Sequence, residues 1–176
     1  HLVDPSTVEV VERDYPLLTP KEANAAIKRS MRRRLVVVGG CIGTDARTVG
    51  IDAILNIKGF AGEKGLEYYR ELKVVNLGAQ VSVPELVDAA REEKADAVLV
   101  SQVVTQRDVH KENARQLVDE LERLGVRDRV TAILGGPRID HRLAHELGYD
   151  AGFGPGTKPS DVANFIVGAV LRRMGK

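Results

Sequence analysis

The chain has 176 residues and a mass of 19.2 kDa, the size of one ordinary domain with room for a short appendage. A chain of this length buries roughly 70% of its unfolded surface on folding, so its core needs no disulfide or metal support. The 26 Lys and Arg residues balance 25 Asp and Glu residues, and the net charge of +1 creates no overall field for nucleic acid or anionic lipid. No apolar run reaches the roughly 18 residues of a membrane span.

The start of the sequence and its cysteine content predict the compartment in which the protein is found. The sequence shows no signal peptide, and its single cysteine, Cys41, cannot form an intrachain disulfide. Both features predict a reducing, cytoplasmic setting. His1 in place of an initiator methionine suggests a fragment of a longer protein.

Residues 1–32 precede the periodic part of the sequence. We interpret them as an N-terminal extension or linker, and residues 33–176 as one folded domain. A short helix is expected to begin at Thr19-Pro20, with Thr19 as its cap and Pro20 at its first position. The segment ends in basic residues without interleaved aromatic side chains, which we interpret as a solvated helix face: Lys28, Arg29, Arg32, Arg33 and Arg34.

From residue 35 onward, short apolar runs alternate with segments of helical periodicity. The runs lie at residues 35–38, 74–77, 97–100, 130–134 and 151–153. They lack polar alternation, as expected of strands buried on both faces. Apolar stripes predict helices over 83–90, 114–124 and 162–170, with Ser160 capping the last. This order predicts an α/β fold: a flavodoxin-like, doubly wound parallel sheet of five strands in the order 2-1-3-4-5.

This topology places a ligand at the carboxyl ends of the strands, near the switch point between strands 1 and 3. The loops there are rich in glycine and small hydroxyl residues: 39–50, 101–106, 135–138 and 152–156. Such loops let a large flat or elongated ligand approach the backbone. The first loop lacks both standard phosphate fingerprints, which disfavours nicotinamide and ATP sites. A phospho-acceptor receiver is also disfavoured, because the third strand ends in Ser101 and not in Asp.

Spaced motifs follow three of the predicted strands. They are Asp45-x-Arg47-x-x-Gly50, Ser101-x-Val103 and Gly135-Gly136. In this order they resemble the D-x-H-x-x-G, S-x-L and G-G pattern of cobalamin-binding domains. The stretches 43–53, 99–106 and 148–156 are similar to the small subunits of lysine 5,6-aminomutases, and the resemblance covers about residues 34–170.

The resemblance implies a base-off cobalamin site. In that family the dimethylbenzimidazole is displaced from cobalt, and the nucleotide tail lies in a slot between the sheet and its flanking helices. By position, Ser101 would hydrogen-bond the displaced base, and Gly135 and Gly136 would leave it room. Val103, Gly154 and Gly156 are assigned to the same cofactor site, together with Asp45, Arg47, Gly50 and Lys58. Without a ligand, Ser101 simply ends a strand and the glycine pair makes a turn.

Position 47 departs from the family pattern. The family's His donates a ring nitrogen to cobalt and is oriented by the neighbouring Asp. Arg47 has no lone pair to donate, so no residue is assigned to the metal. Asp45 pairs with Arg47 or caps the following helix. Three outcomes stay open: a five-coordinate or water-ligated cobalt with the tail in its slot, a base-on cofactor, or no useful cobalamin binding. We expect His110, His141 and His145 to be poor substitutes.

Lys58 is the second chemical signal. It follows position 47 by eleven residues, in Asn56-Ile57-Lys58-Gly59-Phe60. At the matching position the aminomutase family has the lysine that forms the internal aldimine with pyridoxal phosphate. A primary amine is required, because only it condenses with the aldehyde. By periodicity alone, Lys58 is one surface lysine among many.

Together these features imply an isomerase subunit. The resemblance implies the cobalamin-binding subunit of an aminomutase that uses adenosylcobalamin and pyridoxal phosphate for radical 1,2-amino migration on lysine or a related basic amino acid. A larger barrel subunit would bind the substrate, giving a hetero-oligomer in which this chain alone has no turnover. Two alternatives stay open: a non-catalytic corrinoid-binding or regulatory module that has lost His ligation, and an interaction domain without a cofactor.

Overall fold

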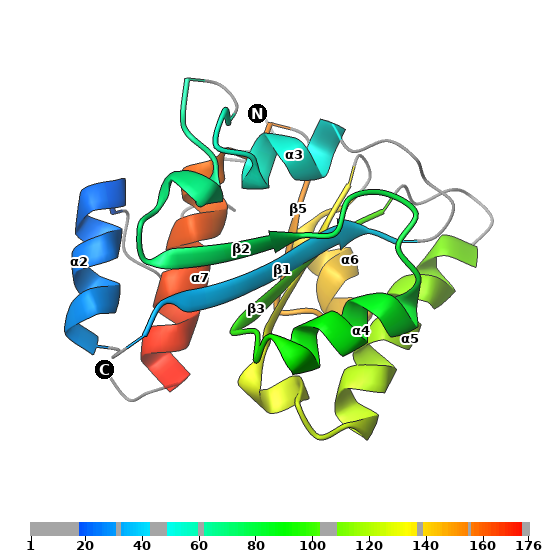
Figure 1. The fold of residues 1–176 in the computed structure, drawn as a ribbon. Coiled ribbons are helices and arrows are strands. Elements are labelled where there is room, and N and C mark those ends of the chain that lie inside the picture. Colours follow the sequence, from blue (N-terminus) through cyan, green and yellow to red (C-terminus); the bar gives the residue numbers. More distant parts are fainter. Residues whose placement is uncertain are drawn as a thin grey trace.

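The computed structural model describes residues 18–30, 33–42, 49–59, 62–102, 109–136, 139–154 and 156–173. Within these residues, five parallel strands form one sheet in the order β2-β1-β3-β4-β5 (Figure 1). The strands are β1 (Leu35–Cys41), β2 (Leu72–Asn76), β3 (Ala97–Ser101), β4 (Thr131–Gly135) and β5 (Ala151–Phe153). The predicted flavodoxin-like α/β fold and its strand order are confirmed.

Helices cover both faces of the sheet. They are α2 (Pro20–Ser30), α3 (Val49–Leu55), α4 (Val83–Glu92), α5 (Val109–Arg123), α6 (His141–Glu146) and α7 (Pro159–Arg173). Helices α2, α3 and α7 pack on one face, and α4, α5 and α6 pack on the other (Figure 1). Among the described segments, no helix has the length and apolar character of a membrane span.

The start of α7 differs from the sequence prediction. The helix begins at Pro159, so Ser160 lies inside it and is not its cap. Two carboxylates serve this helix start: Asp161 Oδ2 accepts from the N–H of Lys158 and Glu63 Oε1 accepts from the N–H of Ser160, each at 3.0 Å. A carboxylate near a helix N-terminus also suits the helix dipole.

Strands β1, β3 and β4 are buried on both faces because their side chains alternate between two apolar clusters. The edge strand β2 is only partly buried, so the expectation of burial on both faces was wrong for the run at 74–77. In β1, Val36 and Val38 pack with α4 and α5, whereas Leu35 and Val37 pack with α3 and α7. All 7 residues of β1 are buried. A strand in this position needs an uninterrupted apolar run, which is the pattern that predicted it.

Helix α2 packs in the same apolar cluster as α3 and α7. Its start confirms the predicted cap, because Thr19 Oγ1 accepts from the N–H of Glu22 at 3.2 Å and the Glu22 carboxylate accepts from the N–H of Thr19 at 3.0 Å. Ala23, Ala26 and Ile27 are buried in the cluster. Part of the predicted extension therefore contributes core residues, and the boundary at residue 33 stays a prediction.

The basic run divides into two parts with different surroundings. Lys28 and Arg29 are exposed in the last turn of α2, as predicted. Arg33 instead forms a bidentate pair with Asp96 at 2.7 and 2.8 Å, and Arg34 donates to a backbone carbonyl of β2 at 2.8 Å. Arg33 and Arg34 are exposed, as predicted, but the prediction of a helix face is wrong for them, and Arg32 lies outside the described residues. The chain has left the helix there, and both side chains reach the amino end of the sheet.

The register of the sheet defines the edge where a ligand is expected. Cys41 pairs with Ser101, Ser101 with Gly135, and Gly135 with Phe153. These residues form one row across β1, β3, β4 and β5 at the carboxyl ends of the strands. Two of the residues assigned to the cofactor, Ser101 and Gly135, are therefore direct neighbours.

Candidate functional site

Ser101 and Gly135 lie on the same face of the sheet. Leu99 and Ile133, two residues earlier in β3 and β4, both belong to the apolar cluster with α3 and α7. Because side chains alternate along a strand, Ser101 and Gly135 continue this face. Each is the partly exposed last residue of a strand that is otherwise buried.

The face at Gly135 is not covered by side chains of the described residues. A Cβ built there meets only two backbone oxygens, of Phe153 at 3.5 Å and of Val100 at 3.9 Å. Gly39 on β1 is a useful contrast, because a Cβ there would lie 2.7 Å from Cδ1 of Leu55. Helix α3 thus fills the space at Gly39, whereas at Gly135 the described residues leave room for an added Cβ.

The other glycines of the predicted site have different environments. A Cβ at Gly136 would clash with the carbonyl oxygen of Gln102, and a Cβ at Gly154 would lie 2.7 Å from that of Ile139. Close backbone packing explains these two glycines without a ligand. At Gly156, with φ +86°, no described atom lies within 4 Å of the added Cβ.

Several predicted site residues lie outside the described part of the chain. Asp45, Arg47 and Val103 fall there, so their contacts with a cofactor stay predictions. Gly50 is placed in the first turn of α3. The residues that the structure does bring together are Ser101 and Gly135, with the Gly136 backbone directly following.

Lys58 lies apart from this row. It is exposed in the loop after α3, which runs back from the carboxyl edge of the sheet (Figure 1). The loop is tightly closed: Asn56 Oδ1 accepts from the Lys58 N–H at 3.0 Å, and a Cβ at Gly59 would meet the Glu63 carbonyl oxygen. Glu63 Oε1 in turn accepts from the Ser160 N–H at 3.0 Å, which fixes the loop to the start of α7.

Gln102 is a residue that the sequence analysis passed over. It is only 2% exposed, and among the described residues neither Nε2 nor Oε1 of its amide has a hydrogen-bond partner. The signal was present in the sequence as an amide directly after a buried apolar strand, inside the Ser101-x-Val103 motif. Periodicity does not reveal whether such a group has a partner.

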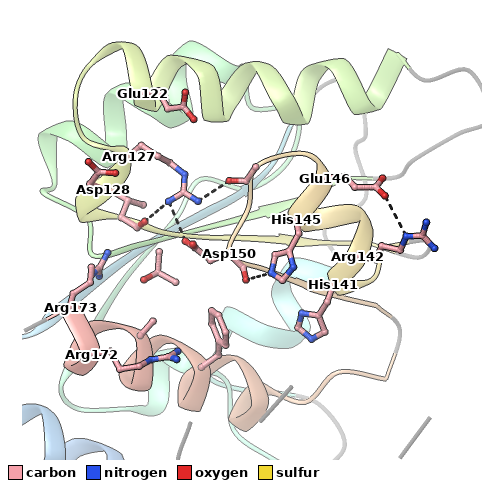
Figure 2. A pocket seen from close by; sticks show the side chains of 15 residues that line it. Glu122, Arg127, Asp128, His141, Arg142, His145, Glu146, Asp150, Arg172 and Arg173 are labelled. Atoms are coloured by element: carbon pink, nitrogen blue, oxygen red, sulfur yellow. Dashed lines mark hydrogen bonds and ion pairs between the residues drawn. The ribbon is translucent and has the colours of Figure 1, made fainter. Parts of the chain in front are cut away.

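A separate groove of about 1180 Å³ runs beside β5, between α6 and α7. Figure 2 shows His141 and His145 projecting from α6 on this side. His145 Nε2 donates to the carbonyl of Asp150 at 2.7 Å, and His141 Nδ1 accepts from the N–H of Gly152 at 3.2 Å. Both imidazoles thus form a hydrogen bond with the backbone at the edge strand.

The positive and negative side chains that line this groove largely balance each other. Arg127 pairs with Asp150 at 3.2 Å, and Arg142 pairs with Glu146 at 3.4 Å (Figure 2). Burial lowers the pKa of Arg173, which lines the same groove and donates to a backbone carbonyl. The groove therefore presents little net charge to a ligand, and the row of Ser101 and Gly135 remains the better candidate site.

Comparison with known proteins identifies the family of the chain. Residues 24–163 match the family described as "B12 binding domain". The chain is 49% identical over 171 residues to a lysine 5,6-aminomutase beta subunit of Fusobacterium nucleatum subsp. nucleatum, covering 97% of this chain and 65% of that protein. It is 49% identical over 167 residues to the corresponding subunit of Acetoanaerobium sticklandii, covering 95% and 63%. The chain thus spans less than two thirds of the length of these relatives.

A solved structure shares the fold. A cobalamin-binding protein from Desulfitobacterium hafniense DCB-2 superposes with a TM-score of 0.58 at 22% identity, over 88% of this chain and 66% of that one. The family match spans all five strands and most of the helices described above. On this ground, the chain belongs to the family of B12-binding domains.

Proposed function

We propose that this chain is the cobalamin-binding part of an aminomutase that uses adenosylcobalamin and pyridoxal phosphate to move an amino group on lysine or a related basic amino acid. The observation that carries the proposal is the uncovered face at Gly135 beside Ser101. The similarity to two lysine 5,6-aminomutase beta subunits supports the reaction and the substrate class.

The residues of the row suit the nucleotide tail of a base-off cobalamin. The Ser101 hydroxyl would donate to a ring nitrogen of the displaced base, and the face at Gly135 would accept the flat ring. Arg47 supplies no nitrogen to cobalt, because a guanidinium has no free lone pair. When bound, adenosylcobalamin supplies a carbon-centred radical by homolysis of its cobalt–carbon bond, and pyridoxal phosphate supplies an aldehyde for the substrate amine.

The surroundings of Lys58 support contact with a partner subunit. Ile57 and Tyr68 are each 52% exposed, and they are the exposed large apolar side chains of the described residues. Glu67 Oε1 accepts from the Ile57 N–H at 2.8 Å, so the segments that carry these two side chains adjoin beside Lys58. Exposed apolar surface suits a protein interface. We propose that Lys58 presents its amine to pyridoxal phosphate bound mainly by a larger barrel subunit of the same hetero-oligomer.

Filling the face at Gly135 tests the cobalamin site. Gly135→Val adds a side chain whose Cβ meets no atom closer than 3.5 Å among the described residues outside its two chain neighbours, so we expect the fold to be retained. We expect the affinity for adenosylcobalamin to fall at least about tenfold while the melting temperature stays within about 3 °C. Thr131→Val, at the start of the same strand, is the matched control and should bind normally. Equal affinity of wild type and Gly135→Val would contradict the site.

Trapping with borohydride tests Lys58. Reduction of the chain in the presence of pyridoxal phosphate and the large subunit should label Lys58, and Lys58→Gln should abolish the label. Lys64→Gln is the control, because Lys64 is an exposed lysine of the same loop. Equal labelling of Lys58 and Lys64 would contradict a specific role.

A non-catalytic corrinoid module is the second candidate, and Arg47 favours it. Both candidates predict cobalamin binding at the row of Ser101 and Gly135. They differ at Lys58, because only the aminomutase role requires its specific labelling. Cobalamin binding without that label would therefore identify the module.

A further inference from the structure

Gln102 is the residue whose buried side-chain polar atoms lack a hydrogen-bond partner within the described residues. Other buried polar side chains are bonded: Asn164 makes hydrogen bonds with Leu18 and Ser160, and Asp96 with Arg33. An amide that is buried without a partner lowers the stability of the fold and calls for an explanation.

The backbone holds Gln102 in a fixed position at the carboxyl edge. Its N–H donates to the carbonyl of Gly135 at 2.9 Å, and its own carbonyl oxygen packs against Gly136. The N–H of Ile42 donates to Ser101 at 3.2 Å, so Ile42, Gln102 and Gly136 form the row directly beyond Ser101 and Gly135. The unbonded amide therefore belongs to the edge where the cobalamin is proposed to bind.

Gln102 and Ser101 serve opposite faces of the sheet. Val98 and Val100 pack in the cluster with α4 and α5, and alternation places Gln102 on that side. The buried residues of that face form an apolar cluster, to which Ile42 and Ile139 belong. A ligand lying across the strand ends can contact Ser101 on one face and Gln102 on the other.

We propose that the Gln102 amide hydrogen-bonds a primary amide on the rim of the corrin ring. This inference rests on the proposed function, since it requires a corrinoid at the carboxyl edge. The corrin ring carries primary amides around its periphery. The Gln102 side chain can pair with one of them, because each amide offers both a donor and an acceptor. Because both polar atoms are covered in the cobalamin-free chain, the residues over them shift when the corrinoid binds.

The stability of the cobalamin-free chain is the first test. Gln102→Met keeps the size of the side chain and removes the unbonded amide, so the melting temperature should rise by about 2–4 °C. Gln116→Met, on the exposed side of α5, is the control and should leave it unchanged. A lower melting temperature for Gln102→Met would show that the amide already has a partner, and would overturn the inference.

Binding of two corrinoids is the second test. Equilibrium dialysis with cobalamin and with cobinamide, which lacks the nucleotide tail, separates the ring from the tail. Gln102→Met should bind both about tenfold more weakly than wild type. Ser101→Ala should bind cobalamin more weakly and cobinamide normally, because its proposed contact is with the tail.

The outcomes separate this inference from the proposed function. Unchanged binding of both corrinoids by Gln102→Met, or a loss for cobalamin alone, would overturn the contact with the corrin ring while leaving the cobalamin site intact. Absence of cobalamin binding by the wild-type chain would overturn the proposed function itself, and the inference with it.

Discussion

The Asp96 carboxylate accepts three hydrogen bonds at the amino end of the sheet. It accepts two from Arg33, at 2.7 and 2.8 Å, and one from the N–H of Val36 at 2.8 Å. The hydrogen bond with this carboxylate raises the pKa of Arg33. The Asp96 side chain is only 9% exposed, so water cannot replace these bonds when it is removed.

We expect Asp96→Ala to lower the free energy of unfolding by about 2–3 kcal/mol, because it leaves the buried Val36 N–H without an acceptor. Denaturation by urea measures this. Glu120→Ala is the control: Glu120 pairs with Arg123 at the same 2.7 Å but on an exposed helix surface, where such pairs contribute little. A similar loss in both variants would contradict the importance of burial.

Tyr69 makes the stability depend on pH in the alkaline range. Burial first, and the charge of Glu63 second, raise the pKa of Tyr69 from 10.0 to about 12. Between these values the folded chain holds a proton that the unfolded chain has lost. Stability is therefore fully present below pH 10.0 and falls as the pH rises toward about 12. Tyr69→Phe should show a shallower fall in urea denaturation across this window, and equal slopes would contradict the assignment.

For single residues, the sequence predicted their place in the sheet better than the contacts that their side chains make. Ser101 and Gly135 were assigned together, and the register makes them neighbours. The missing partner of Gln102 and the pairing of Arg33 with Asp96 could not be predicted, because each depends on contacts between segments far apart in the sequence. Periodicity reports which face a residue takes, and not what it meets there.

At the scale of elements, Asn164 joins α7 to the segment before α2. The residue is 3% exposed; its Oδ1 accepts from the Leu18 N–H at 2.7 Å, and its Nδ2 donates to the Leu18 carbonyl at 3.2 Å and to Ser160 at 2.7 Å. These bonds give both the N–H and the carbonyl of Leu18 a partner. The amide therefore fixes the entry into α2 against the core.

We expect Asn164→Ala to destabilise the chain by about 2 kcal/mol and to speed hydrogen exchange at the Leu18 amide. Exchange followed by mass spectrometry measures the second effect. Asn113→Ala on α5 is the control, because within the described residues the Asn113 side chain makes no hydrogen bond. Unchanged exchange at Leu18 in Asn164→Ala would contradict this role of the amide.

The elements themselves were predictable because local patterns determine them. The apolar run at 35–38 marks β1, and Thr19 with Glu22 marks the start of α2. Helix α3 is only 7 residues long and gave no apolar stripe, so it was expected only from the alternation of strands and helices. Its packing against Gly39, and the open face at Gly135, follow from tertiary contacts that no local pattern contains.

At the scale of the whole molecule, the two proposed sites lie in separate parts of the fold. The row with Ser101 and Gly135 lies at the strand ends, whereas Lys58 lies beyond α3 beside exposed apolar side chains. This separation suits a chain that holds the corrinoid with its own sheet and offers the lysine to another subunit. Arg47 cannot offer a nitrogen to cobalt, so in the proposed site the binding energy has to come from contacts with the tail and the corrin ring.

The visible absorption spectrum of adenosylcobalamin during titration with the wild-type chain tests the central claim most directly. The base leaves cobalt only if the tail has a slot beside Ser101 and Gly135. We predict that the bound cofactor shows a base-off spectrum, and that Gly135→Val loses this change. A bound cofactor that keeps its base-on spectrum, or a spectrum that does not respond to the chain, would contradict the account.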